Sequence, residues 1–361
     1  MDLYVLDKEF NTLGLLDQFD SFIWTDRYNE AGDFEIYTAV TTDLLSLLKA
    51  DRYLWWGETE HTMIIEQITI DTDEDTGNML TVTGRSLESI LDRRIIWNQT
   101  DLKDTLPNCI KKLLTENAIS PTDPNRKIPG LIFVDPTDTR LTSIKLEGQI
   151  TGDNLYNTIV TFCQTYNVGF KVTLDESNQF VFSMYVGDDR SYSQDTLPYV
   201  VFSPDFENVI NSNYFENKST LKNVALVGGQ GDGPDQKKAE VGSGVGLERR
   251  EIWVEAQDIS NINETGGTIT DEEYTAKLKQ RGEETLAENK ITKAFEGDLD
   301  ANQTFVYKKD FFLGDIVQIV NDYGIEARSR VSEMVYSEDS DGVSYLPTFI
   351  VVDEEEESET E

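Results

Sequence analysis

The chain has 361 residues, of which 38% are hydrophobic and 10% aromatic, and a formal net charge of −37. This length and composition are typical of a globular protein with several domains, and the charge argues against nucleic-acid binding, which requires a basic surface. Part of the charge lies in the last nine residues, 353–361 (DEEEESETE), which we expect to form a disordered acidic tail.

The N-terminus and the cysteines indicate where the protein is made. No basic region followed by an apolar block begins the chain, so we expect no signal peptide. No apolar run is long enough to span a membrane. Cys109 and Cys163 lie in apolar helical patterns and are expected to be buried thiols, not a disulfide. These features predict synthesis in the cytoplasm.

The first part of the chain reads as a series of short strands rich in β-branched and aromatic residues. The predicted strands are residues 3–7, 21–28, 33–40, 52–57, 62–71 and 79–86. Their spacing of roughly ten residues is typical of an antiparallel barrel or sandwich. We therefore expect 1–97 to form a first β-barrel module, completed by part of 200–228.

Residues 98–199 are predicted to be an inserted α+β domain. One helix carries Leu106, Ile110, Leu113 and Leu114 on one face, with Pro107 in its first turn. A second begins near Asp153, with a buried stripe of Leu155, Ile159, Phe162, Cys163 and Tyr166. Residues 169–187 alternate across a turn and predict a hairpin.

The rest of the chain returns to strands. Residues 200–299 are expected to start a second β module, with a glycine-rich crossing and a helix that opens with a capping box, Thr270 and Glu273. Residues 300–352 are expected to complete a second β-barrel, with Asp341 and Gly342 at a hairpin tip. The fold class is thus mainly β with inserted α+β segments, in several domains.

No catalytic or metal-binding pattern stands out. His61 is the only histidine, which excludes a histidine metal triad, and its position after a turn predicts a surface residue. Asp71, Asp73 and Asp75 alternate as in a calcium loop, but the glycine is seventh and the twelfth position is valine, so a hairpin turn is favoured. With 68 acidic residues, a pair of carboxylates has no specificity for a glycosidase.

The stretch ALVGGQGDGPDQKK, residues 225–238, resembles a phosphate-binding loop only in its glycines. Gly233 is followed by Pro234 where a phosphate loop needs lysine, and extended segments follow where a dinucleotide loop needs a helix. We interpret the glycines as a flexible crossing between β modules and predict no cofactor.

Five stretches in order resemble the baseplate-hub or tail-tip (Tal-type) proteins of long-tailed bacteriophages. They are WTDRYNEAGDFEI (24–36), GRSLESILDRRI (84–95), YVGDDRSYSQ (185–194) with VVFSPDFENV (200–209), VALVGGQGDG (224–233) with GLERREIWVEA (246–256), and YKKDFFLGDIVQI (307–319). The resemblance covers residues 1 to about 350.

The resemblance implies a structural hub without catalysis. Such hubs are homotrimers with two barrels per subunit, which form a pseudo-sixfold ring between the distal tail protein ring and the tip or fibre. The implied partners are the distal tail protein, the tape-measure protein and tip or fibre proteins, and the implied location is the tail of the virion. DNA would pass through the lumen without specific binding, which suits an acidic wall.

Interface residues are the site residues that we predict. Arg85, Arg93 and Arg94 are cations near the end of the first module, and they would pair either with carboxylates of a neighbouring subunit or within their own chain. Trp24 and Arg27 of the first motif, and Trp97 at the end of the module, complete the candidate list.

The alternative function is a tail module that binds or hydrolyses the host cell wall. Trp55, Trp56 and Trp97 would stack on sugars if they are exposed, although aromatic residues in strands more often serve cores or interfaces. Because the chain stops soon after the last predicted barrel, we expect no peptidase or lysin extension and no peptidoglycan cleavage.

Overall fold

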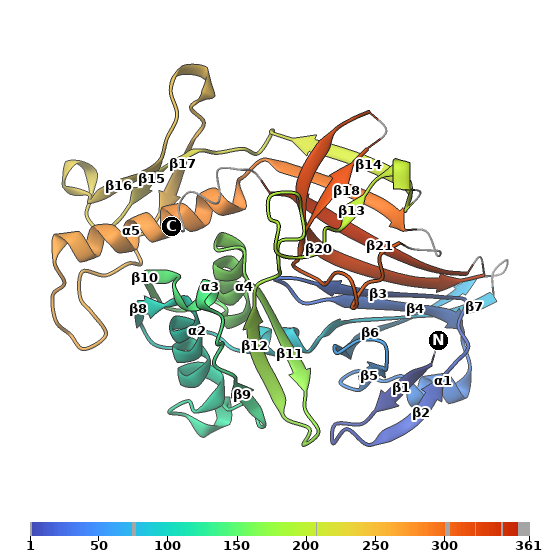
Figure 1. Cartoon of the computed structure of the whole chain (residues 1–361). Coiled ribbons are helices and arrows are strands. Elements are labelled where there is room, and N and C mark those ends of the chain that lie inside the picture. Colours follow the sequence, from blue (N-terminus) through green and yellow to red (C-terminus); the bar gives the residue numbers. More distant parts are fainter. Residues whose placement is uncertain are drawn as a thin grey trace.

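The computed structural model describes residues 2–73, 77–206, 208–299, 304–321, 323–340 and 342–352. Within these residues the fold is mainly β, as predicted, with helices inserted between the strands (Figure 1). The acidic tail at 353–361 and Asp341, at the predicted hairpin tip, lie outside the described residues.

The N-terminal part of the chain forms seven strands and one short helix. They are β1 (Leu3–Leu6), β2 (Thr12–Leu16), β3 (Ser21–Arg27), β4 (Asp33–Ala39), α1 (Thr42–Leu47), β5 (Tyr53–Trp56), β6 (Thr62–Asp73) and β7 (Gly77–Ser86). Along β4, Phe34 and Ile36 are buried while Glu35 is exposed, which is the two-residue period of a strand with one face on a core. The six predicted strands are confirmed; β2 and α1 were not predicted.

The C-terminal part supplies the other strands of the same network. They are β13 (Val201–Phe202), β14 (Val209–Asn217), β18 (Thr292–Leu299), β19 (Ile316–Val320), β20 (Glu326–Asp339) and β21 (Gly342–Val351). Together the 13 strands follow the path β14-β18-β21-β20-β3-β4-β7-β6-β5-β1-β2, with β19 paired to β20 and β13 to β19 (Figure 1).

Strand β20 joins the two groups of strands. It pairs antiparallel with β3, and Tyr336 lies opposite Trp24. One hydrophobic core spans both groups and contains Phe22 and Trp24 from the first and Phe202 and Phe349 from the second. The two predicted β modules thus share a core and a hydrogen-bonded network, and their division into separate barrels stays a prediction.

The strand that pairs with the N-terminal group of strands is β20, and not one from residues 200–228. Part of residues 200–228 was expected to complete that group, whereas β13 pairs with β19 and β14 with β18. Instead β20, which is long enough for two neighbours on one edge, pairs with β19 over Glu326–Arg330 and with β3 over Glu333–Glu338.

An α+β unit with its own hydrophobic core lies between the two groups of strands in sequence. Its elements are η1 (Leu87–Arg93), β8 (Thr100–Thr105), α2 (Leu106–Leu114), η2 (Thr115–Ile119), η3 (Pro124–Arg126), β9 (Leu131–Phe133), α3 (Thr139–Thr142), β10 (Lys145–Ile150), α4 (Leu155–Thr165), β11 (Gly169–Leu174) and β12 (Phe180–Tyr185). The helices predicted near Leu106 and Asp153 are α2 and α4, and the predicted hairpin is β11–β12. Cys109 and Cys163 are buried free thiols, as predicted.

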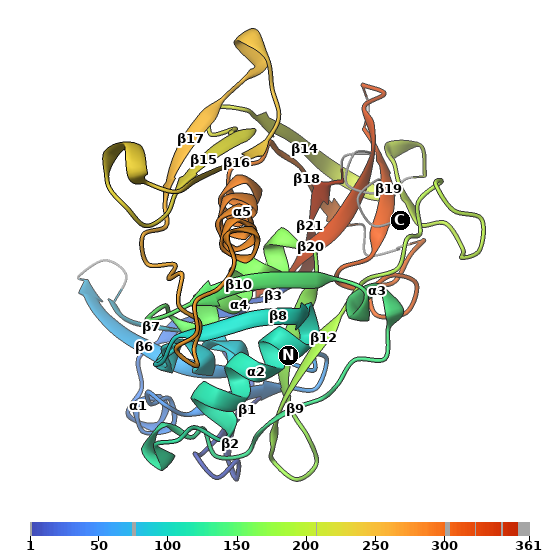
Figure 2. The ribbon, with the colours of Figure 1, turned by 90° about the vertical axis from the view of Figure 1, so that its left-hand side faces the viewer.

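A third unit consists of a small sheet covered by a helix. Its elements are β15 (Val224–Gly228), η5 (Gly233–Asp235), β16 (Lys238–Gly242), η6 (Gly246–Glu248), β17 (Glu251–Glu255) and α5 (Asp271–Glu288). Helix α5 begins with the predicted capping box of Thr270 and Glu273, and it lies between this sheet and the β8–β10 pair (Figure 2). No helix in the described part of the chain is long and apolar enough to cross a membrane.

The glycine-rich stretch is a hairpin loop, not the predicted crossing between β modules. It connects β15 to β16, which pair antiparallel in the same three-stranded sheet. A Cβ on Gly229 would lie 2.5 Å from the hydroxyl oxygen of Tyr274 in α5, so glycine allows this close approach without a shift of the tyrosine. The loop contains the short 3₁₀ turn η5 and leads directly into strand β16.

Candidate functional site

His61 is buried, contrary to the prediction of a surface turn residue. Its Nδ1 atom lies 3.3 Å from a carboxylate oxygen of Glu88, which is fully buried in η1. Glu88 also accepts the backbone N–H of Val172 in β11 at 2.8 Å. The pair therefore ties the N-terminal strands to the α+β unit, a contact between distant residues that no local sequence pattern signals.

In this pair each side chain stabilises the charged form of the other. Burial alone would lower the pKa of His61, but the carboxylates of Asp26 and Glu88 raise it to about 9. Burial raises the pKa of Glu88, yet the neighbouring imidazolium and its hydrogen bonds bring that pKa below its usual value. At neutral pH the two side chains form a buried ion pair, and a histidine held protonated in this way is unsuited to act as a general base.

His61 also lines a cleft of about 660 Å³ where three parts of the chain meet. Its walls come from residues 57–61, 185–188 and 307–315, together with Asp26 and Lys171. The basic groups of the cleft are occupied: Lys171 pairs with Glu60 at 2.6 Å, and Lys308 donates to the carbonyl of Glu58 at 2.6 Å. These contacts hold the three parts together.

No metal centre is evident in the described part of the chain, where no group of three or more His, Cys, Asp and Glu side chains is placed to hold an ion. The alternating aspartates end β6, and Asp73 pairs with Gly77 across the hairpin to β7. The predicted hairpin is therefore confirmed, whereas Asp75 lies outside the described residues.

Two of the predicted interface residues serve the subunit itself. Trp24 is fully buried in the main core, and its indole N–H donates to the carboxylate of Asp26 at 2.9 Å. Trp24 therefore has no exposed surface for contact with a partner. Arg27 binds Glu333 of β20 at 2.7 Å and Asp33 at 2.6 Å, so its charge is satisfied within the chain.

Arg85 is also paired within its own chain. Its Nε and Nη2 atoms donate to both carboxylate oxygens of Glu66, at 2.8 and 2.9 Å, and Nη2 also binds Asp92 at 3.2 Å. This two-point geometry is the strong form of an arginine–carboxylate contact. Of the two alternatives for Arg85, the structure contains the intramolecular one.

Arg93, Arg94 and Trp97 lie together with residues that the sequence did not point to. The guanidinium of Arg126 stacks on the ring of Trp97, 4.9 Å from its centroid, and Arg94 donates to the carbonyl of Arg126. Trp97 is 62% exposed. We call Arg93, Arg94, Trp97, Arg126 and Lys127 the arginine–tryptophan patch.

Two of the three tryptophans considered for sugar stacking do not form a common platform. Trp55 and Trp56 are neighbours on β5, and successive strand residues point to opposite faces. Trp55 is 40% exposed, whereas Trp56 is buried in the main core against Trp24 and Tyr336. This arrangement removes the sequence argument for a paired aromatic sugar site.

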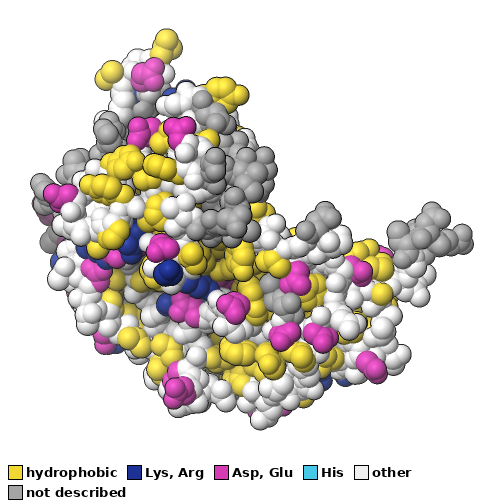
Figure 3. Space-filling model, turned by 45° about the vertical axis from the view of Figure 1, so that its right-hand side comes forward, with side chains coloured by type: hydrophobic (Ala, Val, Ile, Leu, Met, Phe, Trp, Pro, Cys, Tyr) yellow, Lys and Arg dark blue, Asp and Glu magenta, His cyan; other side chains and the backbone are white. Residues whose placement is uncertain are grey.

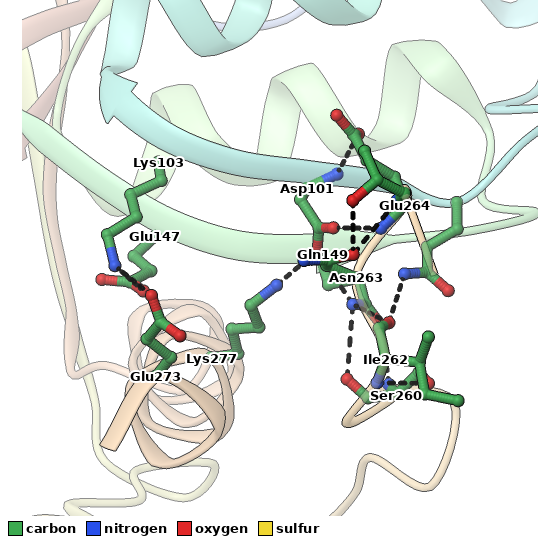
Figure 4. A network of polar contacts seen from close by, with 12 residues as sticks. Asp101, Lys103, Glu147, Gln149, Ser260, Ile262, Asn263, Glu264, Glu273 and Lys277 are labelled. Carbon is green, nitrogen blue, oxygen red and sulfur yellow. Dashed lines mark hydrogen bonds and ion pairs between the residues drawn. The ribbon is translucent and has the colours of Figure 1, made fainter. Parts of the chain in front are cut away.

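The α+β unit and the third unit meet through polar contacts, shown in Figure 4. We call this contact the polar seam, made of Asp101, Lys103, Glu147, Gln149, Glu264, Glu273 and Lys277. Asp101 of β8 is its centre. It accepts the ammonium of Lys277 from α5, the amide of Gln149 at 2.8 Å and the backbone N–H of Glu264 at 2.6 Å.

Large apolar side chains are exposed at both ends of the main strand path. Leu13 and Leu15 on β2 are 43% and 45% exposed, and Phe215 on β14 is 47% exposed. Figure 3 shows apolar side chains in several areas of one face, among acidic ones. Open edge strands with exposed apolar residues are typical of surfaces that another chain covers.

A comparison with known families places nearly the whole chain in one of them. Residues 2–349 match the model of the family described as Siphovirus ReqiPepy6 Gp37-like protein. No curated protein sequence matches the chain.

Solved structures with the same fold come from phage-derived and bacterial tail proteins. The 43 kDa tail protein of prophage MuSo2 from Shewanella oneidensis has a TM-score of 0.58 and 13% identity, and 99% of each chain is covered. The tail protein from Neisseria meningitidis MC58 has a TM-score of 0.57 and 14% identity, over 98% of this chain and 96% of that one. Prophage tail protein gp18 from Listeria monocytogenes EGD-e has a TM-score of 0.53 and 16% identity, over 97% of this chain and 94% of that one.

Proposed function

The chain belongs to the Siphovirus ReqiPepy6 Gp37-like protein family, and from that premise we propose that it is the structural hub of a phage tail tip or baseplate. In this role it is a component of the virion tail. The observation that carries the proposal is the match to the family along residues 2–349, together with a fold shared with tail proteins from end to end.

The proposed assembly is a homotrimer that forms a pseudo-sixfold ring. A subunit with two β modules gives a trimer six such modules, which suits a junction between a sixfold tail tube and a threefold tip. The pairing of β20 with β3 supports this assembly, because it joins the two groups of strands around one hydrophobic core. The apolar side chains exposed on edge strands β2 and β14 provide surfaces that neighbouring subunits would cover.

The proposed partners are the distal tail protein ring and the tape-measure protein on one side and tip or fibre proteins on the other. The net charge of −37 supports a second element of the proposal, that the ring lines the DNA conduit. Negative walls repel phosphates, so the genome passes without the contacts that would retain it.

The proposed role is structural and involves no catalysis. The only histidine is held in a buried ion pair with Glu88, and the lysines of the adjoining cleft are bound to a carboxylate and a carbonyl. Each of these groups stabilises a contact between parts of the fold.

The oligomeric state tests the proposal. We expect mass photometry of the purified full chain to give three times the 41.0 kDa subunit mass, and electron-microscopy class averages to show a threefold ring with six peripheral modules. Binding to the distal tail protein of the same phage, by co-elution, is the second expected result. A monomer at micromolar concentration that does not bind the distal tail protein would overturn the proposal.

A further inference from the structure

The arginine–tryptophan patch gathers positive charge on a strongly acidic protein. The segment at residues 93–97 runs beside residues 126–127, because Arg94 donates to the carbonyls of Arg126 and Lys127 and Arg126 donates to that of Ile95. These reciprocal contacts fix two guanidinium groups next to each other. Arg93, which precedes Arg94 in the sequence, and Lys127, which follows Arg126, are exposed.

The cations at the centre of the patch are bound to carbonyl groups instead of carboxylates. Among the described residues, no carboxylate forms an ion pair with Arg94 or Arg126, and Arg93 reaches only Asp51, at 3.8 Å. Burial and the positive charges of Arg126 and Arg93 lower the pKa of Arg94, which reflects the repulsion between like charges. An anion at this position would relieve that repulsion.

Contacts within the chain position the side chains of the patch. Asn117 accepts the backbone N–H of Trp97 at 3.1 Å and also contacts the guanidinium of Arg126 at 3.3 Å. The guanidinium of Arg126 lies over the Trp97 ring, 4.9 Å from its centroid, and Trp97 is 62% exposed. Preorganised arginine and tryptophan side chains are the groups that dominate binding energy in protein interfaces.

The donor inventory of Arg94 matches a carboxylate. A guanidinium has five N–H groups, and Arg94 uses one each on Nε, Nη1 and Nη2 for the carbonyls of Arg126, Arg93 and Lys127. One N–H remains on each terminal nitrogen, and a carboxylate can accept two such donors at once.

The small size of the patch favours a short acidic peptide over a nucleic acid as its anionic partner. A nucleic acid would extend past these four cations onto a surface that belongs to a chain with 68 acidic and 31 basic residues, where phosphates are repelled. A short run of acidic side chains ends within the patch. Its apolar stems would cover Trp97 and the exposed Ile95.

We propose that the arginine–tryptophan patch is a docking site for a short carboxylate-rich peptide segment of a neighbouring protein subunit. The proposal rests on the proposed function in one respect, namely that the protein has neighbours in a tail. The proposal specifies the segment that the neighbouring subunit contributes. This segment has two or more consecutive Asp or Glu side chains, bound by Arg94 and Arg126 and packed on Trp97.

A peptide-binding experiment tests the proposal. The probe is a labelled peptide DEEEESETE, the sequence of residues 353–361, and the control peptide has every acidic residue replaced by its amide. By fluorescence anisotropy with the full chain, we expect the acidic probe to bind and the amide peptide not to bind. The affinity should fall when NaCl rises from 50 to 300 mM, because partly exposed ion pairs are screened.

Matched variants place the binding at the patch. The double variant Arg94→Gln, Arg126→Gln should bind the acidic probe with at least tenfold lower affinity. This is the loss expected when one or more charge-assisted contacts are removed. Arg250→Gln is the control, because Arg250 likewise donates to a backbone carbonyl, that of Lys218, but lies outside the patch. If the double variant does not fold, Trp97→Ala and Lys127→Gln can be used in its place, because both side chains are exposed. Each of these changes should also weaken binding of the acidic probe.

Three outcomes would overturn the proposal: no binding of the acidic probe, equal binding by the double variant, or tighter patch-dependent binding of a single-stranded oligonucleotide of the same charge. The oligomeric state of the same samples separates this test from that of the hub. A trimer that does not bind the probe refutes the docking site alone, and a monomer that binds it at the patch refutes the hub alone.

Discussion

His61 Nδ1 lies 3.3 Å from a carboxylate oxygen of Glu88, and both side chains are buried. Each residue belongs to a different part of the fold, since His61 precedes β6 and Glu88 lies in η1 and holds the backbone of β11. Removing one member of a buried pair leaves an uncompensated charge, which is far more destabilising than the loss of an exposed ion pair.

The pH dependence of stability should report this ion pair. The pKa of His61 is raised from 6.5 to about 9, so its contribution is complete below pH 6.5 and is lost as the pH rises to about 9. The pKa of Glu88 is lowered from 4.5, so its contribution is present above pH 4.5 and is lost at more acidic pH. We expect up to about 3 kcal/mol of the free energy of unfolding to disappear between pH 6.5 and 9.

The comparison needs a variant, because self-repulsion of this acidic protein also grows with pH. Denaturant unfolding of the wild type and His61→Gln should show a smaller loss for the variant over this pH range. Parallel stability profiles of the two proteins would contradict the assignment.

Glycine at position 84 should be irreplaceable. A Cβ there would lie 1.8 Å from the carbonyl oxygen of Ile64 and 2.9 Å from the ring of Phe34, where β6 has an irregular register against β7. Because backbone atoms cannot move aside cheaply, Gly84→Ala should destabilise the protein by about 3 kcal/mol. Gly148→Ala in β10 is the control, since its nearest atoms are at 3.9 Å; equal denaturation midpoints for the two variants would refute the prediction.

Lys277 should control the docking of the third unit. Its ammonium reaches Asp101 across the polar seam, and its side chain is only 6% exposed. Lys277→Met should leave Asp101 without its cation and loosen α5, so that amide hydrogen exchange in α5 becomes at least tenfold faster, which corresponds to about 1.4 kcal/mol. Lys279→Met, on the exposed side of the same helix, should leave exchange unchanged. Equal protection in the two variants would argue against the seam as the main contact.

The contact between Arg27 and Glu333 should stabilise the joint between the two groups of strands. The two side chains bind at 2.7 Å across β3 and β20 and are only about one-quarter exposed, at 27% and 26%. A double-mutant cycle with Arg27→Met and Glu333→Gln should give a coupling energy of about 1–2 kcal/mol from unfolding experiments. Additivity of the two changes within about 0.3 kcal/mol would show that the contact is not a stabilising one.

The elements with a strong local pattern could be predicted from the sequence. Alternation along residues 33–40 predicted β4, and the stripe from Leu155 to Tyr166 predicted α4. The capping box of Thr270 and Glu273 located the start of α5. These signals are local, because periodicity and capping depend on residues within one or two turns or strand repeats of each other.

The candidate site residues were less predictable. The sequence pointed to Arg93, Arg94 and Trp97, but Arg126 joins them only because η3 folds beside them. His61 was predicted to be exposed because a turn precedes it, and only the packing of η1 against β6 buries it. Trp24 and Arg27 lie in a recognisable motif, yet the motif serves the core and the joint to β20.

By itself the sequence determined the mainly β composition, the strands and helices with a strong local pattern, the acidic charge and the family resemblance, because each of these is carried by local patterns and residue counts. Only the tertiary structure decided that β20 joins β3, that the glycine-rich loop closes a hairpin within one sheet, and that Arg126 meets Trp97 and Arg94. Strand pairing and side-chain clusters join residues far apart in the chain, and their partners are chosen by competition among all surfaces that fold together.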